Sequence, residues 1–274
     1  MAAMLPPPGD ENTLYLLDLS CWMYRFYATV QGRATHAFIE FVSKILRLQR
    51  PTYIACALDL RWPTFRHLLA PRREGSKEGY KAQRSAPDPT LLERIRWAQE
   101  TLEDVHGIPL FAERGFEADD VIATLAKNAR AEGMKVVIIA LDKDLMQLVD
   151  EGTVLWDGKN TVVGPLDVQR KFGVRPDQLR DYLAIVGDTA DNIPGVRGAG
   201  PRAAVEILQA FGDLDTALVH AELGTDPDGF FRRRPRYREL LRANPEAIRL
   251  SIKLVSLACD VPLGTSRDDL RRCA

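Results

Sequence analysis

Cysteine and histidine are few in this chain, and neither follows a pattern that binds metal. The four cysteines show no CxxC spacing and stand at Cys21, Cys56, Cys259 and Cys273. This spacing argues against a structural zinc site and favours buried thiols in a reducing compartment over disulfides. The four histidines are scattered as well, at His36, His67, His106 and His220. Scattered histidines favour surface or packing roles, so neither a Ser-His-Asp triad nor a histidine metal centre is predicted.

Long apolar runs are also missing. No segment approaches the roughly 20 consecutive apolar residues that a membrane-spanning helix needs. Residues 1–12 lack the basic and apolar regions of a secretory signal, and we expect them to form a flexible tail. The 274 residues suffice for one large domain or two smaller ones with buried cores. These features together predict a cytoplasmic globular protein.

Three apolar segments of this chain each run directly into an aspartate. The segments are residues 14–17, 54–58 and 136–141, and the acids that follow them are Asp18, Asp59 and Asp142. If the segments are parallel strands of one sheet, all three carboxylates emerge at the same edge, where open α/β sheets bind their ligands. Grouped carboxylates repel one another unless a cation lies between them. The pattern therefore indicates a divalent metal site.

Further acids fall at strand ends or in turns. They are Glu117, Asp119 and Asp120 at the start of an expected helix, Asp144 in a D-x-D pattern, and Asp188 and Asp191 three residues apart. Taken singly, the first three are typical of helix caps, and the others are typical of turns. Taken together, they supply more hard oxygen ligands than one ion uses. This favours two Mg²⁺ or Mn²⁺ ions over zinc, and two ions can support an in-line phosphoryl displacement.

The charge distribution supports a polyanionic substrate. The net charge is only −1, from 37 Lys and Arg and 38 Asp and Glu residues. If nine acids are gathered in one site, 29 remain against the 37 cations, so the rest of the chain is basic. A basic body around an acidic site suits a protein that holds a polyanion and cleaves it with metal.

The order of elements predicts an α/β protein. Strands alternate with amphipathic helices over residues 36–49 and 90–105 and from Glu117 onward, and a further short strand is expected at residues 154–156. Such alternation favours a parallel sheet with helices on both faces. From residue 176 the chain reads as mostly helical. It contains the turn-forming glycines Gly195, Gly198 and Gly200 and an arginine-rich stretch over residues 232–242.

Three blocks of the sequence carry a family resemblance. They read EADDVI from Glu117, DKDLMQLV from Asp142 and GDTADNIPGV from Gly187. These blocks resemble the signatures of the 5′-3′ exonuclease domain of bacterial DNA polymerase I. Phage 5′-exonucleases and flap endonucleases belong to the same superfamily. The resemblance runs in order over nearly the whole chain.

The resemblance implies a PIN-like nuclease core over residues 13–175, including a helical arch at 61–89. A helix-three-turn-helix DNA-binding region would follow over residues 176–274, with a C-terminal return to the core. It also implies two Mg²⁺ ions, which Mn²⁺ can replace. The ligands would be Asp18, Asp59, Glu117, Asp119 and Asp120 for one ion, and Asp142, Asp144, Asp188 and Asp191 for the other.

The resemblance further implies which residues contact DNA. In the arch, Arg66, Lys81 and Arg84 would be the catalytic cations, with Lys81 stabilising charge on the scissile phosphate. Tyr80 would stack on a base. The glycine turn and Arg202 would bind duplex backbone through main-chain amides, with a K⁺ ion. Without the resemblance, the arch cations read as solvated loop charges and the glycines as an ordinary turn between helices.

The predicted function is a Mg²⁺-dependent 5′-3′ exonuclease and 5′-flap endonuclease that acts on DNA in replication or repair. We expect a monomeric, nucleoid-associated bacterial protein that is a free-standing nuclease or works with a separate DNA polymerase. Two alternatives stay open. One is a PIN-type ribonuclease, against which the long arch and the glycine turn argue, and the other is a structure-specific DNA-binding protein without catalysis.

Overall fold

The computed structural model describes residues 3–60, 63–71, 78–226, 228–243 and 245–272. Its contacts divide the chain into two compact units. The first comprises Met1–Thr64, Ala86–Pro165 and Leu257–Ala274, and the second comprises Phe65–Ser85 and Leu166–Ser256. The predicted arch falls partly outside the described residues, at 61–62 and 72–77. Its described part contains one short helix, α3 (Phe65–Leu69).

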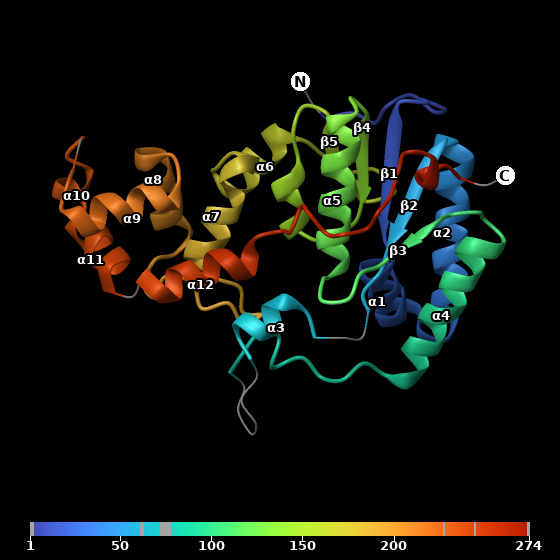
Figure 1. Cartoon of the computed structure of the whole chain (residues 1–274), viewed down its shortest axis with the longest axis horizontal. Helices are drawn as coiled ribbons and strands as arrows, with labels where there is room; N and C mark the ends of the chain where they lie inside the picture. Colours follow the sequence, from blue (N-terminus) through green and yellow to red (C-terminus); the bar gives the residue numbers. More distant parts are fainter. Residues whose placement is uncertain (1–2, 61–62, 72–77, 227, 244, 273–274) are drawn as a thin grey trace. The chain divides into compact units, whose positions relative to one another are not determined.

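The first unit is built on one sheet (Figure 1). Its strands lie in the order β3-β2-β1-β4-β5-β6. Their bounds are β1 (Thr13–Asp18), β2 (Tyr53–Ala57), β3 (Leu110–Phe111), β4 (Lys135–Ile139), β5 (Thr153–Trp156) and β6 (Val162–Val163). The three strands that lead into aspartates are therefore neighbours. They are also parallel, with Leu17 paired to Cys56 on one side and to Ile139 on the other.

Helices cover both faces of this sheet, as predicted. Helix α5 (Ala118–Ala131) packs on β1, β2 and β4, and α1 (Leu19–Val30), α2 (Ala34–Gln49) and α4 (Pro89–Asp104) form the other layer (Figure 1). Strand side chains alternate between faces, so Tyr15 and Leu17 join the cluster of that second layer. The indole of Trp22 on α1 donates a hydrogen bond to the buried Ile139 carbonyl at 2.9 Å, which fixes α1 against β4.

The second unit is helical. After α6 (Pro165–Phe172) it contains α7 (Pro176–Val186), α8 (Pro201–Phe211), α9 (Leu214–Leu223), α10 (Phe230–Arg233), α11 (Pro235–Ala243) and α12 (Pro245–Val255). The local sequence explains the boundaries of α8 and α9. Gly200 and Pro201 begin α8, and Gly212 ends it. Asp213 then caps α9 by accepting the Thr216 N–H at 2.7 Å.

Several short elements were not predicted. Strand β6 pairs antiparallel with β5 through a two-residue ladder, so the sheet is mixed rather than wholly parallel. Strand β3 also has only two residues, and α1 is a helix that was not predicted from the sequence. Three short 3-10 helices complete the described structure, at Gln31–Arg33, Asp144–Leu148 and Asp268–Leu270. In the part of the chain described here, no helix has the length and apolar character needed to cross a membrane.

Candidate metal centre and nucleic-acid-binding residues

The sheet brings the three strand-end aspartates to one edge. Asp18 is the last residue of β1, and Asp59 and Asp142 follow the ends of the two neighbouring strands. Only 4% of Asp18 is exposed, and its Oδ1 accepts the Cys21 N–H at 2.9 Å at the start of α1. Asp59 Oδ1 accepts the Ala118 N–H at 2.8 Å, which joins the end of β2 to the start of α5.

The carboxylates at this sheet edge raise one another's pKa values. Burial, together with the nearby charges of Asp59 and Asp142, raises the pKa of Asp18 to about 7. Burial also raises the pKa of Asp119 well above its ordinary value, and the carboxylates of Asp18, Asp142, Asp59 and Glu117 add to that shift. Neutral forms are favoured because like charges at this edge repel one another in a poorly solvated environment.

Asp120 differs from the other acids of the α5 start. It is fully buried, its Oδ2 accepts the Glu117 N–H at 3.0 Å, and its Oδ1 accepts the Ala258 N–H at 2.9 Å. The first bond is half of a capping box, so the helix-cap reading from the sequence holds for this residue. The second bond ties the segment after α12 to the start of α5.

The D-x-D pattern forms a tight turn after β4. Asp142 Oδ1 accepts the Asp144 N–H at 2.9 Å, and Asp144 begins the 3-10 helix Asp144–Leu148. Both acids belong to the first unit, together with Asp18, Asp59 and the acids of α5. Within the described residues, no three acidic, histidine or cysteine side chains are already placed to hold a metal ion together.

Asp188 and Asp191 belong to a compact loop of the second unit. Asp188 and Ile193 form a β-bridge, and Asp188 Oδ1 accepts the Ala190 N–H at 2.7 Å. Glycine is required at both ends of this loop. A Cβ at Gly187 would lie 2.6 Å from the Ile193 carbonyl oxygen, and a Cβ at Gly195 would lie 2.7 Å from the Ile185 carbonyl oxygen.

The second half of the arch segment docks on this loop. Lys81 N–H donates to the Asp191 carbonyl at 3.0 Å, and Lys81 Nζ lies 3.7 Å from Asp191 Oδ2. Arg84 forms a further ion pair with the same carboxylate. The Tyr80 hydroxyl donates to Asp191 Oδ2 at 3.3 Å. Three residues that the sequence assigned to DNA contact therefore surround one predicted metal ligand.

Arg66 and Tyr80 have structural contacts that the sequence did not predict. Arg66 is 2% exposed, and its guanidinium donates to the Leu254 and Ser256 carbonyls at 2.9 and 2.7 Å. It therefore caps the C-terminal end of α12. The Tyr80 ring is 3% exposed and packs edge-on against His67, with the ring centroids 5.2 Å apart. In this arrangement neither face of the ring is open to a stacking base.

The glycine turn before α8 is well formed. The Val196 N–H donates to the Ile185 carbonyl at 2.7 Å, and the Ala199 N–H donates to Val196 at 2.8 Å. Gly198 has a left-handed φ of 89°, which side chains disfavour. Arg202 follows in the first turn of α8, with its side chain 82% exposed and its Nε 2.8 Å from Glu206.

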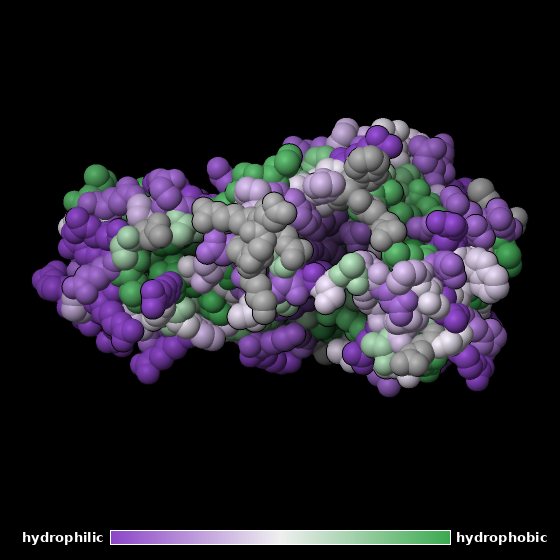
Figure 2. Space-filling model, turned by 90° about the horizontal axis from the view of Figure 1, so that it is seen from below, coloured by the Kyte–Doolittle hydropathy of each residue, from purple (hydrophilic) through white to green (hydrophobic). Residues whose placement is uncertain are grey.

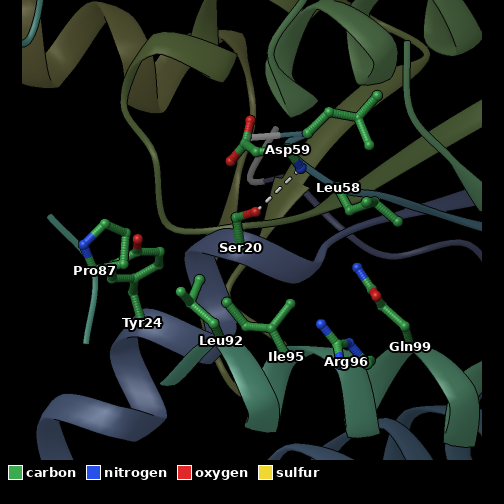
Figure 3. Close-up of a pocket in the computed structure, with 10 residues that line it drawn as sticks. Ser20, Tyr24, Leu58, Asp59, Pro87, Leu92, Ile95, Arg96 and Gln99 are labelled. Carbon is green, nitrogen blue, oxygen red and sulfur yellow. Dashed lines mark hydrogen bonds between the residues drawn. The ribbon is translucent and has the colours of Figure 1, made fainter. Parts of the chain in front are cut away.

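A pocket of about 520 Å³ adjoins Asp59 (Figure 3). Leu92, Ile95, Arg96 and Gln99 point into it from α4, and Asp59 lies across from them. Ser20 and Tyr24 of α1 complete its wall, and Ser20 Oγ accepts the Asp59 N–H at 3.3 Å. This pocket was not predicted from the sequence. A signal was present, because the four α4 residues recur at helical spacing on one face.

Two family models match consecutive parts of the chain. The 5′-3′ exonuclease N-terminal resolvase-like domain matches residues 13–173, and the 5′-3′ exonuclease C-terminal SAM fold matches residues 174–274. The chain belongs to the 5′-3′ exonuclease family. This confirms the resemblance seen in the sequence, and with it the prediction of a 5′-nuclease enzyme.

Individual members of the 5′-3′ exonuclease family align with almost the whole chain. The 5′-3′ exonuclease of Aquifex aeolicus is 38% identical over 271 residues, which cover 95% of this chain and 86% of that protein. DNA polymerase I of Deinococcus radiodurans is 36% identical over 272 residues, which cover 96% of this chain. The chain spans only 27% of the length of that polymerase.

Solved structures share the fold. The phage T5 5′-exonuclease with bound zinc superposes with a TM-score of 0.75 at 22% identity, covering 94% of this chain and 95% of the other. The T5 D15 flap endonuclease in complex with DNA and metal ions superposes with a TM-score of 0.72 at 21% identity, covering 90% and 89%. These similarities confirm the predicted PIN-like core with its C-terminal helical region.

Proposed function

We propose that this protein is a Mg²⁺-dependent 5′-3′ exonuclease and 5′-flap endonuclease that hydrolyses DNA phosphodiesters in replication or repair. One observation carries the proposal. Asp18, Asp59 and Asp142 meet at one sheet edge and repel one another strongly enough to help raise the pKa of Asp18 to about 7. A cluster of this kind is costly for folding and is typical of a functional site. Membership of the 5′-3′ exonuclease family supports the reaction class.

The chemistry of the donor set fits divalent metal. A cation between these carboxylates would relieve the repulsion that raises the pKa of Asp18 and Asp119. Carboxylate oxygens are hard ligands that suit Mg²⁺ or Mn²⁺. We assign Asp18, Asp59, Glu117 and Asp119 to one ion, and Asp142, Asp144, Asp188 and Asp191 to a second. Asp120 is assigned a positioning role, because both of its oxygens already accept backbone N–H groups.

When bound, the two ions would activate a water molecule and neutralise charge on the reacting phosphate. The side chains of this chain supply the remaining functions. Lys81 and Arg84 donate hydrogen bonds to the non-bridging oxygens of the scissile phosphate, where negative charge grows during the reaction. Both cations are within reach of Asp191, so that carboxylate positions them before DNA arrives. Arg66 is left out of this set because it is buried against α12.

Duplex binding is assigned to the glycine turn and to Arg202. Main-chain amides of the turn can approach phosphates closely because Gly198 and Gly200 carry no side chains. A K⁺ ion at this turn is part of the proposal, as is a separate DNA polymerase that acts on the same DNA. The exposed Arg202 side chain would contact the adjoining phosphates. We propose that the protein acts as a monomer.

The direct test is a panel of end-labelled substrates incubated with the protein. A duplex with a DNA flap, the same duplex with an RNA flap, and single-stranded RNA are compared in Mg²⁺, with EDTA as the control. We expect flap DNA to be cleaved in Mg²⁺ alone, leaving 5′-phosphate and 3′-hydroxyl ends. Preferential cleavage of single-stranded RNA would instead support the ribonuclease alternative. Tight flap binding without any product would support a non-catalytic protein.

A further inference from the structure

The proposed function assigns no role to the pocket beside Asp59. Its volume of about 520 Å³ lies within the range of about 300–1,000 Å³ that is typical of small-molecule sites. All of its described lining residues belong to the first unit. The pocket is therefore complete without any residue of the helical unit, and it adjoins a proposed metal ligand.

Helix α4 carries two neighbouring stripes of side chains. The buried stripe, which packs into the core, consists of Leu91, Ala98 and Leu102. The second stripe follows the spacing i, i+3, i+4 and i+7 and consists of Leu92, Ile95, Arg96 and Gln99. Its side chains point into the pocket rather than into the core (Figure 3). The second stripe is therefore a helix face that lines a cavity.

Hydrogen bonds hold the walls of the pocket together. Asp88 caps α4 by accepting the Thr90 N–H at 2.8 Å, and the same carboxylate accepts the hydroxyl of Tyr27 from α1 at 2.5 Å. At the other end of the pocket, Ser20 of α1 accepts the Asp59 N–H at 3.3 Å. These bonds join α4, α1 and the segment after β2. The pocket is thus formed before a ligand arrives, which lowers the entropic cost of binding.

The second stripe combines apolar side chains with two polar ones that the protein does not use. Among the described residues, no hydrogen bond or ion pair engages the side chains of Arg96 and Gln99. Hydrophobic side chains alone would not mark a site, because they also interrupt the mainly hydrophilic surface shown in Figure 2. Apolar walls with a few unengaged polar groups are typical of a site that orients a small ligand.

We propose that this pocket binds the base of a free mononucleotide, which is the product that a 5′-3′ exonuclease releases. The inference rests on the proposed function, because that function supplies the product and places a metal-bound phosphate at Asp59. The planar base lies against Leu92 and Ile95, and the 5′-phosphate lies at the Asp59 end of the pocket. A retained mononucleotide occupies the metal site and so inhibits the next round of cleavage.

The two polar side chains favour guanine over the other bases. A guanidinium group donates to the two neighbouring acceptors O6 and N7 of guanine, whereas adenine presents a donor beside its N7 acceptor. The side-chain oxygen of Gln99 can accept a hydrogen bond from the N1–H group of the same guanine. Arg96 and Gln99 together therefore match the pattern of donors and acceptors on guanine, and we expect the pocket to prefer deoxyguanosine 5′-monophosphate (dGMP).

The test measures ligand binding by equilibrium dialysis in Mg²⁺. The ligands are dGMP, deoxycytidine 5′-monophosphate and the base-free deoxyribose 5-phosphate. We expect the wild type to bind dGMP roughly tenfold more tightly than either of the others. Arg96→Met should bind dGMP about tenfold more weakly, with unchanged affinity for deoxyribose 5-phosphate. The control is Arg47→Met, an exposed arginine of α2 outside the pocket, which should bind like the wild type.

The outcomes separate this inference from the proposed function. Equal affinity of the wild type for the three ligands overturns the inference even if the protein cleaves flaps. Selective dGMP binding by a protein that cleaves no DNA supports the base pocket and contradicts the proposed function. An equal loss of all three ligands in Arg96→Met places this side chain on the phosphate and overturns the base contact. If Arg96→Met does not fold, Gln99→Leu decides, with an expected loss of about fivefold for dGMP alone.

Discussion

The ammonium group of Lys81 lies 3.7 Å from the carboxylate of Asp191. Arg84 binds the same carboxylate, and the Tyr80 hydroxyl donates to it. The proposed function places Lys81 on the scissile phosphate and Asp191 on a metal ion. The pair would thus connect the two proposed roles directly, since the proposed metal ligand also orients the proposed phosphate-binding group.

Replacing Lys81 by alanine tests its proposed catalytic role. We expect the single-turnover cleavage rate to fall by about 10²–10³-fold, the usual effect of removing a donor to transition-state charge. Lys127→Ala is the control, because Lys127 Nζ bonds only to the Cys259 carbonyl at 3.3 Å in the described structure. Equal rates for the two variants would contradict the role of Lys81.

Arg66→Met should weaken folding rather than the chemical step. The substitution leaves the Leu254 and Ser256 carbonyls without their buried donor, and we expect a loss of about 2–4 kcal/mol in unfolding free energy. Urea unfolding gives the stability, and cleavage is measured at a temperature where both proteins are folded. The control is Arg47→Met on the exposed side of α2. Normal stability with a collapsed cleavage rate would instead place Arg66 in catalysis.

Alanine substitutions at Gly187 and Gly212 test how tightly the Asp188–Ile193 loop is packed, with Gly212 as the control. Both residues have left-handed φ angles, 78° at Gly187 and 86° at Gly212. A Cβ added at Gly187 would lie 2.6 Å from the Ile193 carbonyl oxygen, whereas a Cβ added at Gly212 would have no neighbour within 4 Å. Gly212→Ala should cost about 1 kcal/mol. Gly187→Ala should cost roughly 2 kcal/mol more, because the loop must shift. Equal unfolding midpoints would show that the loop tolerates the shift.

The pKa of Asp18 predicts how the metal-free protein responds to pH. Its folded-state pKa, about 7, lies above the ordinary aspartate value because burial and neighbouring carboxylates disfavour the charge. The fold therefore favours the protonated form. The contribution of protonated Asp18 to the free energy of unfolding is complete below about pH 4 and is lost as the pH rises through 7. Thermal melts in EDTA should show this decline for the wild type relative to Asp18→Asn.

Added Mg²⁺ should reverse the decline above pH 7, because the ions bind the ionised carboxylates and stabilise the folded state. A metal-free protein whose stability relative to Asp18→Asn does not change between pH 4 and 7 would contradict the clustering of these acids. The same melts on Asp119→Asn show whether a second carboxylate titrates with Asp18.

The sequence predicted the sheet edge well because the signal is local. Each acid-terminated strand is an apolar run that ends in aspartate, and parallel strands place such ends together. Strands β3 and β6 escaped prediction because two residues carry no periodicity. At the start of α5, both interpretations of the acids apply, one as metal ligands and the other as helix caps. The coupled charges of Glu117 and Asp119 agree with a functional site, whereas Asp120 is a cap.

Contacts between distant segments could not be read from the sequence. Arg66 meets carbonyls almost 190 residues further along the chain, and nothing in its neighbourhood distinguishes a buried cap from a solvated loop cation. The same holds for Lys81 and Asp191, and for Arg236 beside Gly198. Tertiary packing decides these roles, so the residue types were predictable but their partners were not.

The proposed metal-dependent nuclease site is tested most directly by cleavage of a labelled 5′-flap duplex with and without Mg²⁺. The wild type is compared with the double variant Asp119→Ala/Asp142→Ala. The two substitutions remove acids that the proposal assigns to different ions, and the site acts as a unit. We predict Mg²⁺-dependent cleavage by the wild type and no detectable product from the variant, although both proteins remain folded. Cleavage that survives in the variant would contradict the proposed metal-dependent nuclease site.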